Sequence, residues 1–137
     1  MADDILKDNE KLRSAILERI SSTAAGFPER ALNEGLEIVY AREIDHLCVT
    51  VGSPRESLSI PADGPMHAVV LYDPETFEIT GFEVPFFMEK LDKEPRRIAA
   101  FWQFVAELIR SHGDTVYIPG HLETERAERA FRDLALV

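Results

Sequence analysis

Residues 36–51 read LEIVYAREIDHLCVTV, two short runs in which apolar side chains alternate with others. Successive side chains of a β-strand point to opposite faces of a sheet, so a period of two puts every second residue on one face. The residues 42–45 between the runs suit a hairpin connection. The stretch therefore predicts two antiparallel strands whose apolar face carries Leu36, Ile38, Tyr40, Leu47, Val49 and Val51.

A second pair of strands is predicted at 66–72 and 77–84, after a short extended piece at 58–60. Pro74 stands at the second position of the connecting tetrapeptide, which suits a type I turn. Together with the first hairpin, this predicts an antiparallel β-meander of four to five strands over residues 36–84.

Gly81 lies inside the last predicted strand, where the apolar face shifts from Phe77 and Ile79 to Phe82 and Val84. One extra residue in a strand reverses which side chains point to which face. We therefore expect a bulge at this position.

Helical patterns flank the predicted sheet. Apolar residues recur at a helical period in residues 1–22, and residues 94–111 carry one apolar stripe that includes Trp102. A short strand at 115–119 and a last helix at 122–136 follow. Because a sheet with one apolar face must bury it, we expect the helices to pack on that face, with the N-terminal and long central helices as the main cover.

The expected architecture is thus one α+β domain over residues 1–137. It consists of an N-terminal helix at 1–22, the β-meander at 36–84 and a helix-strand-helix segment at 94–137. A chain of this length buries enough surface to fold without disulfides or metals.

The net charge of the chain limits the classes of partner that it can bind. With 25 acidic and 15 basic residues the formal net charge is −10. Such a field repels phosphate backbones and anionic lipid surfaces, whose binding needs Lys and Arg. We expect no nucleic-acid partner.

No run approaches the roughly 18 apolar residues of a membrane-spanning helix, and the single cysteine cannot form an internal disulfide. The sequence therefore predicts a cytoplasmic protein without a membrane partner.

Familiar catalytic and cofactor motifs are absent from the sequence: we find no phosphate-binding loop, paired-cysteine zinc spacing, nucleophile elbow or His-Glu-X-X-His helix. His46 and Cys48 lie two apart and leave the same face of a strand, but a third metal ligand is missing. We expect no metal, no cofactor and no catalytic residue, and whether the chain is an enzyme stays open with the balance against it.

The segments VVLYD at 69–73 and ITGFEV at 79–84, together with the runs at 36–40 and 47–51, resemble a family of short β-meander domains of unknown function. Its members pair an aspartate-led turn with a strand that carries a glycine and a glutamate. The resemblance covers about residues 36–84. It implies a β-meander and no particular activity.

Two sets of residues are candidates for binding. Phe86, Phe87 and Met88 concentrate apolar area after Pro85, and they cannot all point inward from one short turn. They predict a protein interface as the alternative to core. A pocket between the sheet and the long helix is the other candidate, and its lining residues would be Tyr40, His67, Tyr72, Glu83 and Trp102.

Three functional hypotheses follow. The first is a non-enzymatic protein-interaction module, in the form of a homodimer, that uses the sheet edge and residues 86–88. The second is a small-ligand binder or enzyme with the pocket just described. The third is an acidic inhibitor or antitoxin-like protein that occupies a basic partner.

Overall fold

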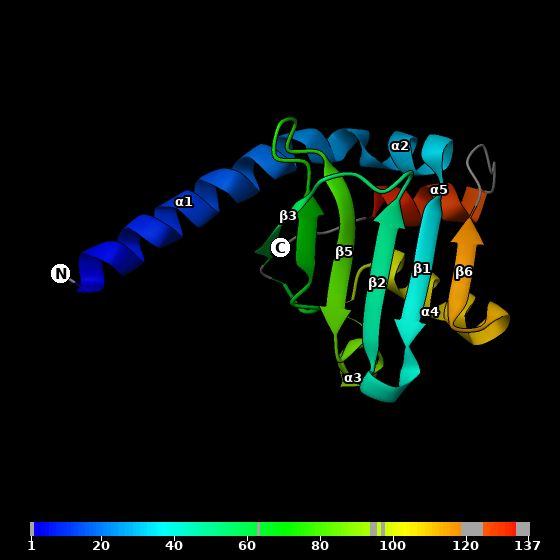
Figure 1. Ribbon diagram of the computed structural model, residues 1–137. Helices are drawn as coiled ribbons and strands as arrows, with labels where there is room; N and C mark the ends of the chain where they lie inside the picture. The colour runs from blue at the N-terminus through cyan, green and yellow to red at the C-terminus, as the bar shows by residue number, and fades with distance from the viewer. Residues whose placement is uncertain (1, 63, 94–95, 97, 119–124, 134–137) are drawn as a thin grey trace.

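The computed structural model describes residues 2–62, 64–93, 96, 98–118 and 125–133. Its centre is an antiparallel sheet of six strands in the order β3-β4-β5-β2-β1-β6 (Figure 1). The strands are β1 (Leu36–Ala41), β2 (His46–Val51), β3 (Leu58–Pro61), β4 (Val69–Tyr72), β5 (Ile79–Pro85) and β6 (Thr115–Ile118). The α+β class is confirmed, and the strand count is one higher than expected.

In these described ranges, five helices and two short 3-10 turns accompany the sheet. They are α1 (Ala2–Thr23), η1 (Ala24–Gly26), α2 (Phe27–Glu34), η2 (Arg42–Ile44), α3 (Phe87–Lys93), α4 (Ala100–His112) and α5 (Glu125–Arg132). The last predicted helix spans 122–136, and its residues 122–124 and 134–136 lie outside the described residues. Among the described helices, none combines the length and apolarity needed to cross a bilayer.

The first hairpin forms as the alternating pattern predicts. Leu36 pairs with Val51 and Ala41 with His46. The alternate residues of both strands are buried, in the burial pattern expected for one apolar face. β6 then pairs with the outer side of β1, with Leu36 opposite Ile118. The two central strands therefore carry the core-facing surface on which the rest packs.

The predicted bulge is present in β5. Leu71 of β4 pairs with Gly81, whereas Tyr72 pairs with Ile79, so Thr80 is the extra residue. The hydroxyl groups of Thr80 and Ser57 lie 2.6 Å apart in a hydrogen bond, which satisfies the buried Thr80. Because of this extra residue, β5 buries its apolar side chains both before and after the bulge.

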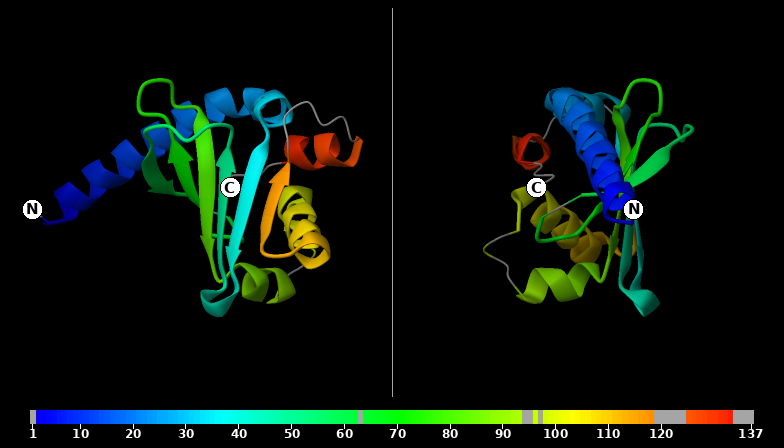
Figure 2. Two further views of the ribbon diagram at one scale, coloured as in Figure 1. Left: turned by 45° about the vertical axis from the view of Figure 1, so that its right-hand side comes forward. Right: turned by 90° about the vertical axis from the view of Figure 1, so that its left-hand side faces the viewer.

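The helices pack on one face of the sheet, as Figure 2 shows from two sides. Phe82 of β5 lies at the centre of this layer, with ring-centroid distances of 5.9 Å to Phe27 of α2, 5.9 Å to Phe101 and 5.3 Å to Trp102 of α4. Phe131 of α5 stands 6.1 Å from Phe101. Edge-to-face contacts of this kind add to the free energy gained by burial.

The helix α1 contributes less cover than the sequence suggests. Its C-terminal part packs on the body through the buried Ile20 and the partly buried Ile16 and Leu17. Leu12 of the same stripe is 61% exposed, and the N-terminal part of the helix projects beyond the β3 edge of the sheet (Figure 1). The helices α2, α4 and α5 therefore form most of the helical layer.

A second difference is α3, which the sequence pattern does not predict. The long predicted helix over 94–111 is shorter and begins at Ala100, where the carboxylate of Asp133 accepts the backbone N–H of Ala100 at 2.7 Å. The residues after β5 instead fold into a separate short helix. The start of α4 thus depends on a carboxylate that is distant in sequence, which a local pattern does not reveal.

We predict that Gly81→Ala destabilises the fold. A Cβ atom at this position would lie 2.3 Å from the backbone oxygen of Val49 on the neighbouring strand. Separating two paired strands to make room costs about 1–3 kcal/mol in the free energy of unfolding, measured by urea denaturation. Gly26→Ala is the matched control, because a Cβ atom added there would meet nothing within 4 Å. Equal stability of the two variants would contradict the prediction.

Candidate interaction surface

The second face of the sheet bears no helix of the described chain (Figure 2). We call this surface the open face, and it is formed by the side chains that alternate with the core residues. Strand registers arrange it in rows that cross the sheet. One row contains Tyr117, Glu37, Thr50, Gly81, Leu71 and Ser59. The next contains Thr115, Val39, Cys48, Glu83, Val69 and Pro61, and a short third row contains Ala41, His46 and Pro85.

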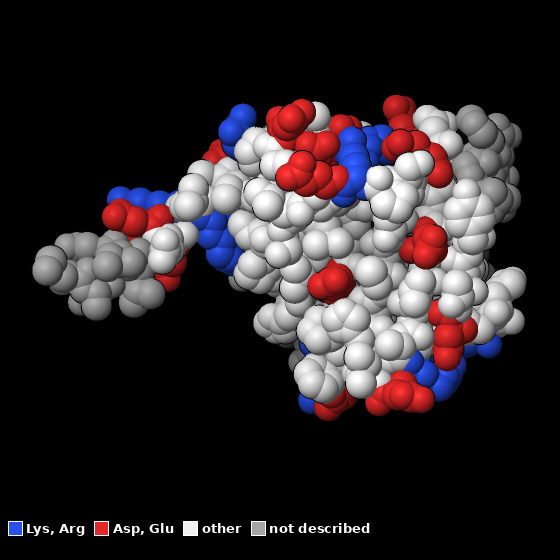
Figure 3. Space-filling view, in the orientation of Figure 1, with Lys and Arg blue, Asp and Glu red and all other residues white. Residues whose placement is uncertain are grey.

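The open face carries very little charge. Charged residues make up 29% of the chain, yet Glu37 and Glu83 are the only formally charged side chains in these rows. Figure 3 looks onto this face and shows a wide uncharged area with isolated acidic groups over the strands. Antiparallel sheets with one solvated face usually alternate apolar and polar residues. The open face departs from that rule on β1 and β4, through Val39, Val69 and Leu71, whereas β2 and β6 place mainly polar residues there.

Apolar side chains occupy much of the open face. Val39 is 38% exposed and Tyr117 is 65% exposed, while Val69, Leu71 and Cys48 are partly exposed. The sequence signal for this surface is the run VVLY at 69–72, in which four successive residues are apolar. Such a run indicates that both faces of a strand avoid water or are covered. The prediction from sequence concerns only the face of the sheet that packs against the core.

A pair of exposed apolar residues lies at one end of the sheet, next to the short third row. Ile44 is 66% exposed and Phe86 is 57% exposed. A hydrogen bond holds the two segments together, since the backbone N–H of Phe87 donates to the backbone oxygen of Asp45 at 3.1 Å. We call Ile44 and Phe86 the apolar tip.

The Asp45 carboxylate fixes the apolar tip. Its Oδ1 accepts hydrogen bonds from the Tyr40 hydroxyl at 2.6 Å and from the Met88 backbone N–H at 2.9 Å. Its Oδ2 accepts the Glu89 backbone N–H at 3.1 Å. The carboxylate therefore caps the start of α3 and neutralises the positive end of its dipole. This cap explains why residues after Pro85 form a helix.

These contacts shift the pKa of both partners. Burial alone raises the pKa of the Asp45 carboxyl, but the bonds from Tyr40, Met88 and Glu89 outweigh it, so the net direction is downward. Burial, followed by the hydrogen bond to Asp45 and its negative charge, raises the pKa of Tyr40 to about 12. At neutral pH, Asp45 is therefore ionised and Tyr40 is a neutral donor.

The backbone at the apolar tip adopts a conformation that is uncommon for its residues. Asp45 has φ of 52° and Phe86 has φ of 54°. Aspartate tolerates this left-handed region, whereas for a bulky residue it is an outlier that costs on the order of 1–3 kcal/mol. The conformation turns the Phe86 ring outward while the next residue, Phe87, is fully buried.

The structure distributes the predicted interface residues in three environments. Phe86 is exposed, Phe87 packs in the core 6.3 Å from Trp102 and 6.4 Å from Tyr40, and Met88 is partly buried. The expectation that at least one of them is exposed is confirmed. Their role as an interface stays a prediction.

The predicted ligand-binding residues do not share a cavity. Tyr40, Tyr72 and Trp102 are buried on the helical side of the sheet, where Tyr72 stacks on Phe77. His67 is exposed in a turn, and its φ is 45°. Glu83 lies on the opposite, open face. The aromatic groups are therefore core residues, and the two polar groups point away from them.

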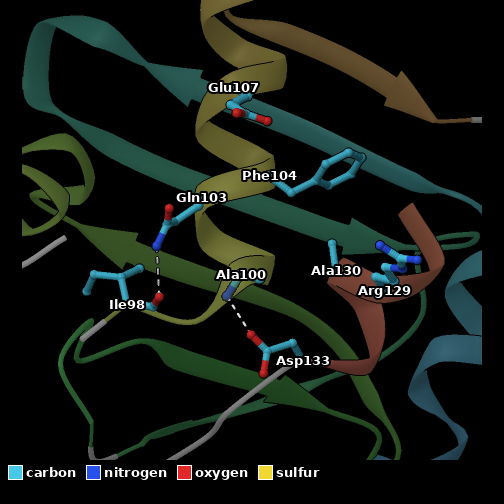
Figure 4. A pocket seen from close by; sticks show the side chains of 8 residues that line it. All are labelled: Ile98, Ala100, Gln103, Phe104, Glu107, Arg129, Ala130 and Asp133. Atoms are coloured by element: carbon cyan, nitrogen blue, oxygen red, sulfur yellow. Dashed lines mark hydrogen bonds between the residues drawn. The ribbon is translucent and has the colours of Figure 1, made fainter. Parts of the chain in front are cut away.

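A hollow of about 430 Å³ lies between α4 and α5 on the side away from the sheet (Figure 4). Two of its four polar side chains hold the start of α4. Asp133 accepts the Ala100 N–H, and the Gln103 side-chain amide donates to the Ile98 carbonyl at 3.0 Å. These contacts fix the start of α4, which gives the two side chains a structural role.

The environment of Cys48 favours the protonated form of its thiol. Burial raises its pKa, and the negative charge of Glu83 raises it further. A protonated thiol is a weak nucleophile and a weak ligand. Among the described residues, no three His, Cys, Asp or Glu side chains gather at a metal-binding distance.

No family model, curated protein or solved structure matches this chain. The resemblance of residues 36–84 to the β-meander family therefore stays a prediction.

We predict that Tyr40 makes stability fall at high pH. Its pKa rises from 10.0 to about 12 on folding, so the stability from this group is present below pH 10 and is lost as the pH rises toward 12. Urea denaturation at successive pH values should show a steeper fall in this window for the natural protein than for Tyr40→Phe. Equal slopes would refute this assignment.

We predict that Phe86→Gly lowers the free energy of unfolding by no more than about 1 kcal/mol, because the lost ring is exposed and glycine adopts positive φ without strain. The neighbouring Phe87→Gly is the matched control. Its ring is fully buried, and losing such a ring costs about 3–5 kcal/mol. Thermal or urea unfolding measures both, and a loss at Phe86 as large as that at Phe87 would show that the exposed ring supports the fold.

Proposed function

We propose that this protein is an interaction module that binds another protein through the open face and the apolar tip. The observation that carries the proposal is the scarcity of charge on a broad sheet face of a strongly charged chain. The fully buried centres of protein interfaces are depleted in charged residues and enriched in aromatic ones. The open face has the first property, and Tyr117 in its rows and Phe86 at the apolar tip are exposed aromatic residues.

The size of this surface is compatible with a specific complex. Six strands spaced about 4.8 Å apart, with two full rows and part of a third, cover roughly 500 Å². The apolar tip extends this area toward the about 800 Å² that each partner buries in a standard interface. Exposed apolar residues that gather on one surface, rather than lying singly, mark interaction sites.

The charges argue against a second copy of the chain as the occupant of the open face. A face-to-face pair would bring Glu37 and Glu83 of both copies together, and the rows contain no Lys or Arg to offset them. Like charges in an interface cost several kcal/mol. The homodimer predicted from the sequence stays a prediction, and this argument directs it to another surface, such as a sheet edge.

The small-ligand alternative has weaker support, because its predicted residues lie on opposite sides of the sheet. The acidic-inhibitor alternative also involves a protein partner, one that carries positive charge. It differs in the contact surface, since an acidic inhibitor would bind through its charged regions and would tolerate changes to the apolar rows.

We predict that Leu71→Arg abolishes partner binding while the fold is kept. Leu71 is partly exposed in a central row, so arginine can extend into solvent, but a partner would have to bury its charge. The measurement is affinity capture from the native lysate with quantitative mass spectrometry, in parallel with circular dichroism. Ser111→Arg in the exposed part of α4 is the matched control, because it adds the same charge on the helical side.

Proteins enriched with the natural chain and with Ser111→Arg, but absent with Leu71→Arg, would support the proposal. Retention of the same proteins by Leu71→Arg would overturn it, as would the absence of any specifically enriched protein.

A further inference from the structure

The open face limits what kind of structure can bind to it. The strands β4, β5, β2 and β1 each have a hydrogen-bonded strand on both sides, so their backbone groups are already paired. An extended peptide binds a sheet by adding to an edge, where free backbone groups are available. On the open face, such a peptide would leave its own N–H and C=O groups buried without partners, which is costly. The occupant must therefore satisfy its backbone internally, as a helix does.

The two glutamates of the open face require a cation from the occupant. Among the described residues, neither Glu37 nor Glu83 has an ion pair within the 4.0 Å that defines one. Covering a carboxylate without supplying a partner leaves a buried unpaired charge, which is strongly destabilising. An apolar occupant without Lys or Arg would incur this cost twice.

The spacing of the glutamates sets a spacing for the cations. Glu37 pairs with Thr50 on β2, and Glu83 pairs with Cys48 on the same strand. The two glutamates are thus separated by two strand spacings across the sheet and by one row along it. That is about 10 Å by about 7 Å, or about 12 Å on the diagonal. Residues seven or eight apart on one face of a helix are separated by about 11–12 Å.

We propose that the open face binds an amphipathic helix of another protein, whose apolar stripe packs on Val39, Val69 and Leu71. Two basic residues of that helix, seven or eight positions apart, pair with Glu37 and Glu83. This inference rests on the proposed function and adds the chemistry of the partner to it.

The test uses synthetic 18-residue helical peptides as probes, labelled for fluorescence anisotropy, in about 0.15 M salt to screen long-range attraction. The first peptide has a leucine stripe flanked by two lysines seven positions apart. In the second, glutamates replace these lysines, and in the third a central proline breaks the helix. We expect the first peptide to bind at least about tenfold more tightly than either of the others.

Charge variants of the protein identify the site. The double variant Glu37→Lys with Glu83→Lys should reverse the preference, so that the glutamate peptide binds more tightly. The variant Glu18→Lys with Glu29→Lys is the matched control, because it changes the net charge equally at exposed positions of α1 and α2. It should keep the preference for the lysine peptide. The milder pair Glu37→Gln with Glu83→Gln should abolish the preference and serves as the test if the lysine variant does not fold.

The inference is overturned if the proline or glutamate peptide binds as tightly as the lysine peptide. It is also overturned if no peptide binds, or if the control variant loses the preference to the same extent as the site variant. These results leave the proposed function intact when Leu71→Arg still loses its partner in the lysate capture. If Leu71→Arg retains all partners, the proposed function itself fails.

Discussion

The packing of Phe82 against three helical side chains is the constraint on which the rest of the structure depends. Its ring meets Phe27 of α2 and both Phe101 and Trp102 of α4 within 6 Å. Because the bulge in β5 directs this ring to one side of the sheet, the aromatic contacts of the core gather there. The helices pack on the side of the sheet that carries these aromatic side chains. The described helices therefore leave the other side uncovered. The position of the candidate surface is thus a consequence of where the core is built.

Much of this architecture could be predicted because its causes are local in sequence. The alternation in 36–51 and the glycine in the last strand of the second hairpin each give their element within a few residues of its observed bounds, and the stripe around Trp102 gives the end of α4 but a start six residues too early. The turn before β5 has an equally local cause, since the Asp73 side chain accepts the backbone N–H of Glu75 at 2.8 Å. What these patterns do not encode is the neighbour of each strand, and β6 accordingly lies at an edge that no local signal marks.

The candidate site was harder to predict because its determinants are distant in sequence. Asp45 looks like an ordinary turn residue, yet it caps a helix that begins some forty residues later along the chain. Tyr40 and Tyr72 have the polar aromatic character of ligand-binding residues, but the tight core uses their rings for packing and the Tyr40 hydroxyl for Asp45. The open face itself is defined only by the strand registers, which align side chains from all six strands into rows.

The pairing of the first strand with the last has a consequence for the order of folding. Leu36 of β1 lies opposite Ile118 of β6, 82 residues further along the chain, so this intervening stretch must be synthesised before the outer side of β1 can be paired. Contacts between segments so far apart close large loops and form late. Until then, the nascent chain presents an unpaired strand edge on which other chains can add. The pairing of β6 with β1 therefore removes an edge that the earlier strands alone leave open to association with other chains.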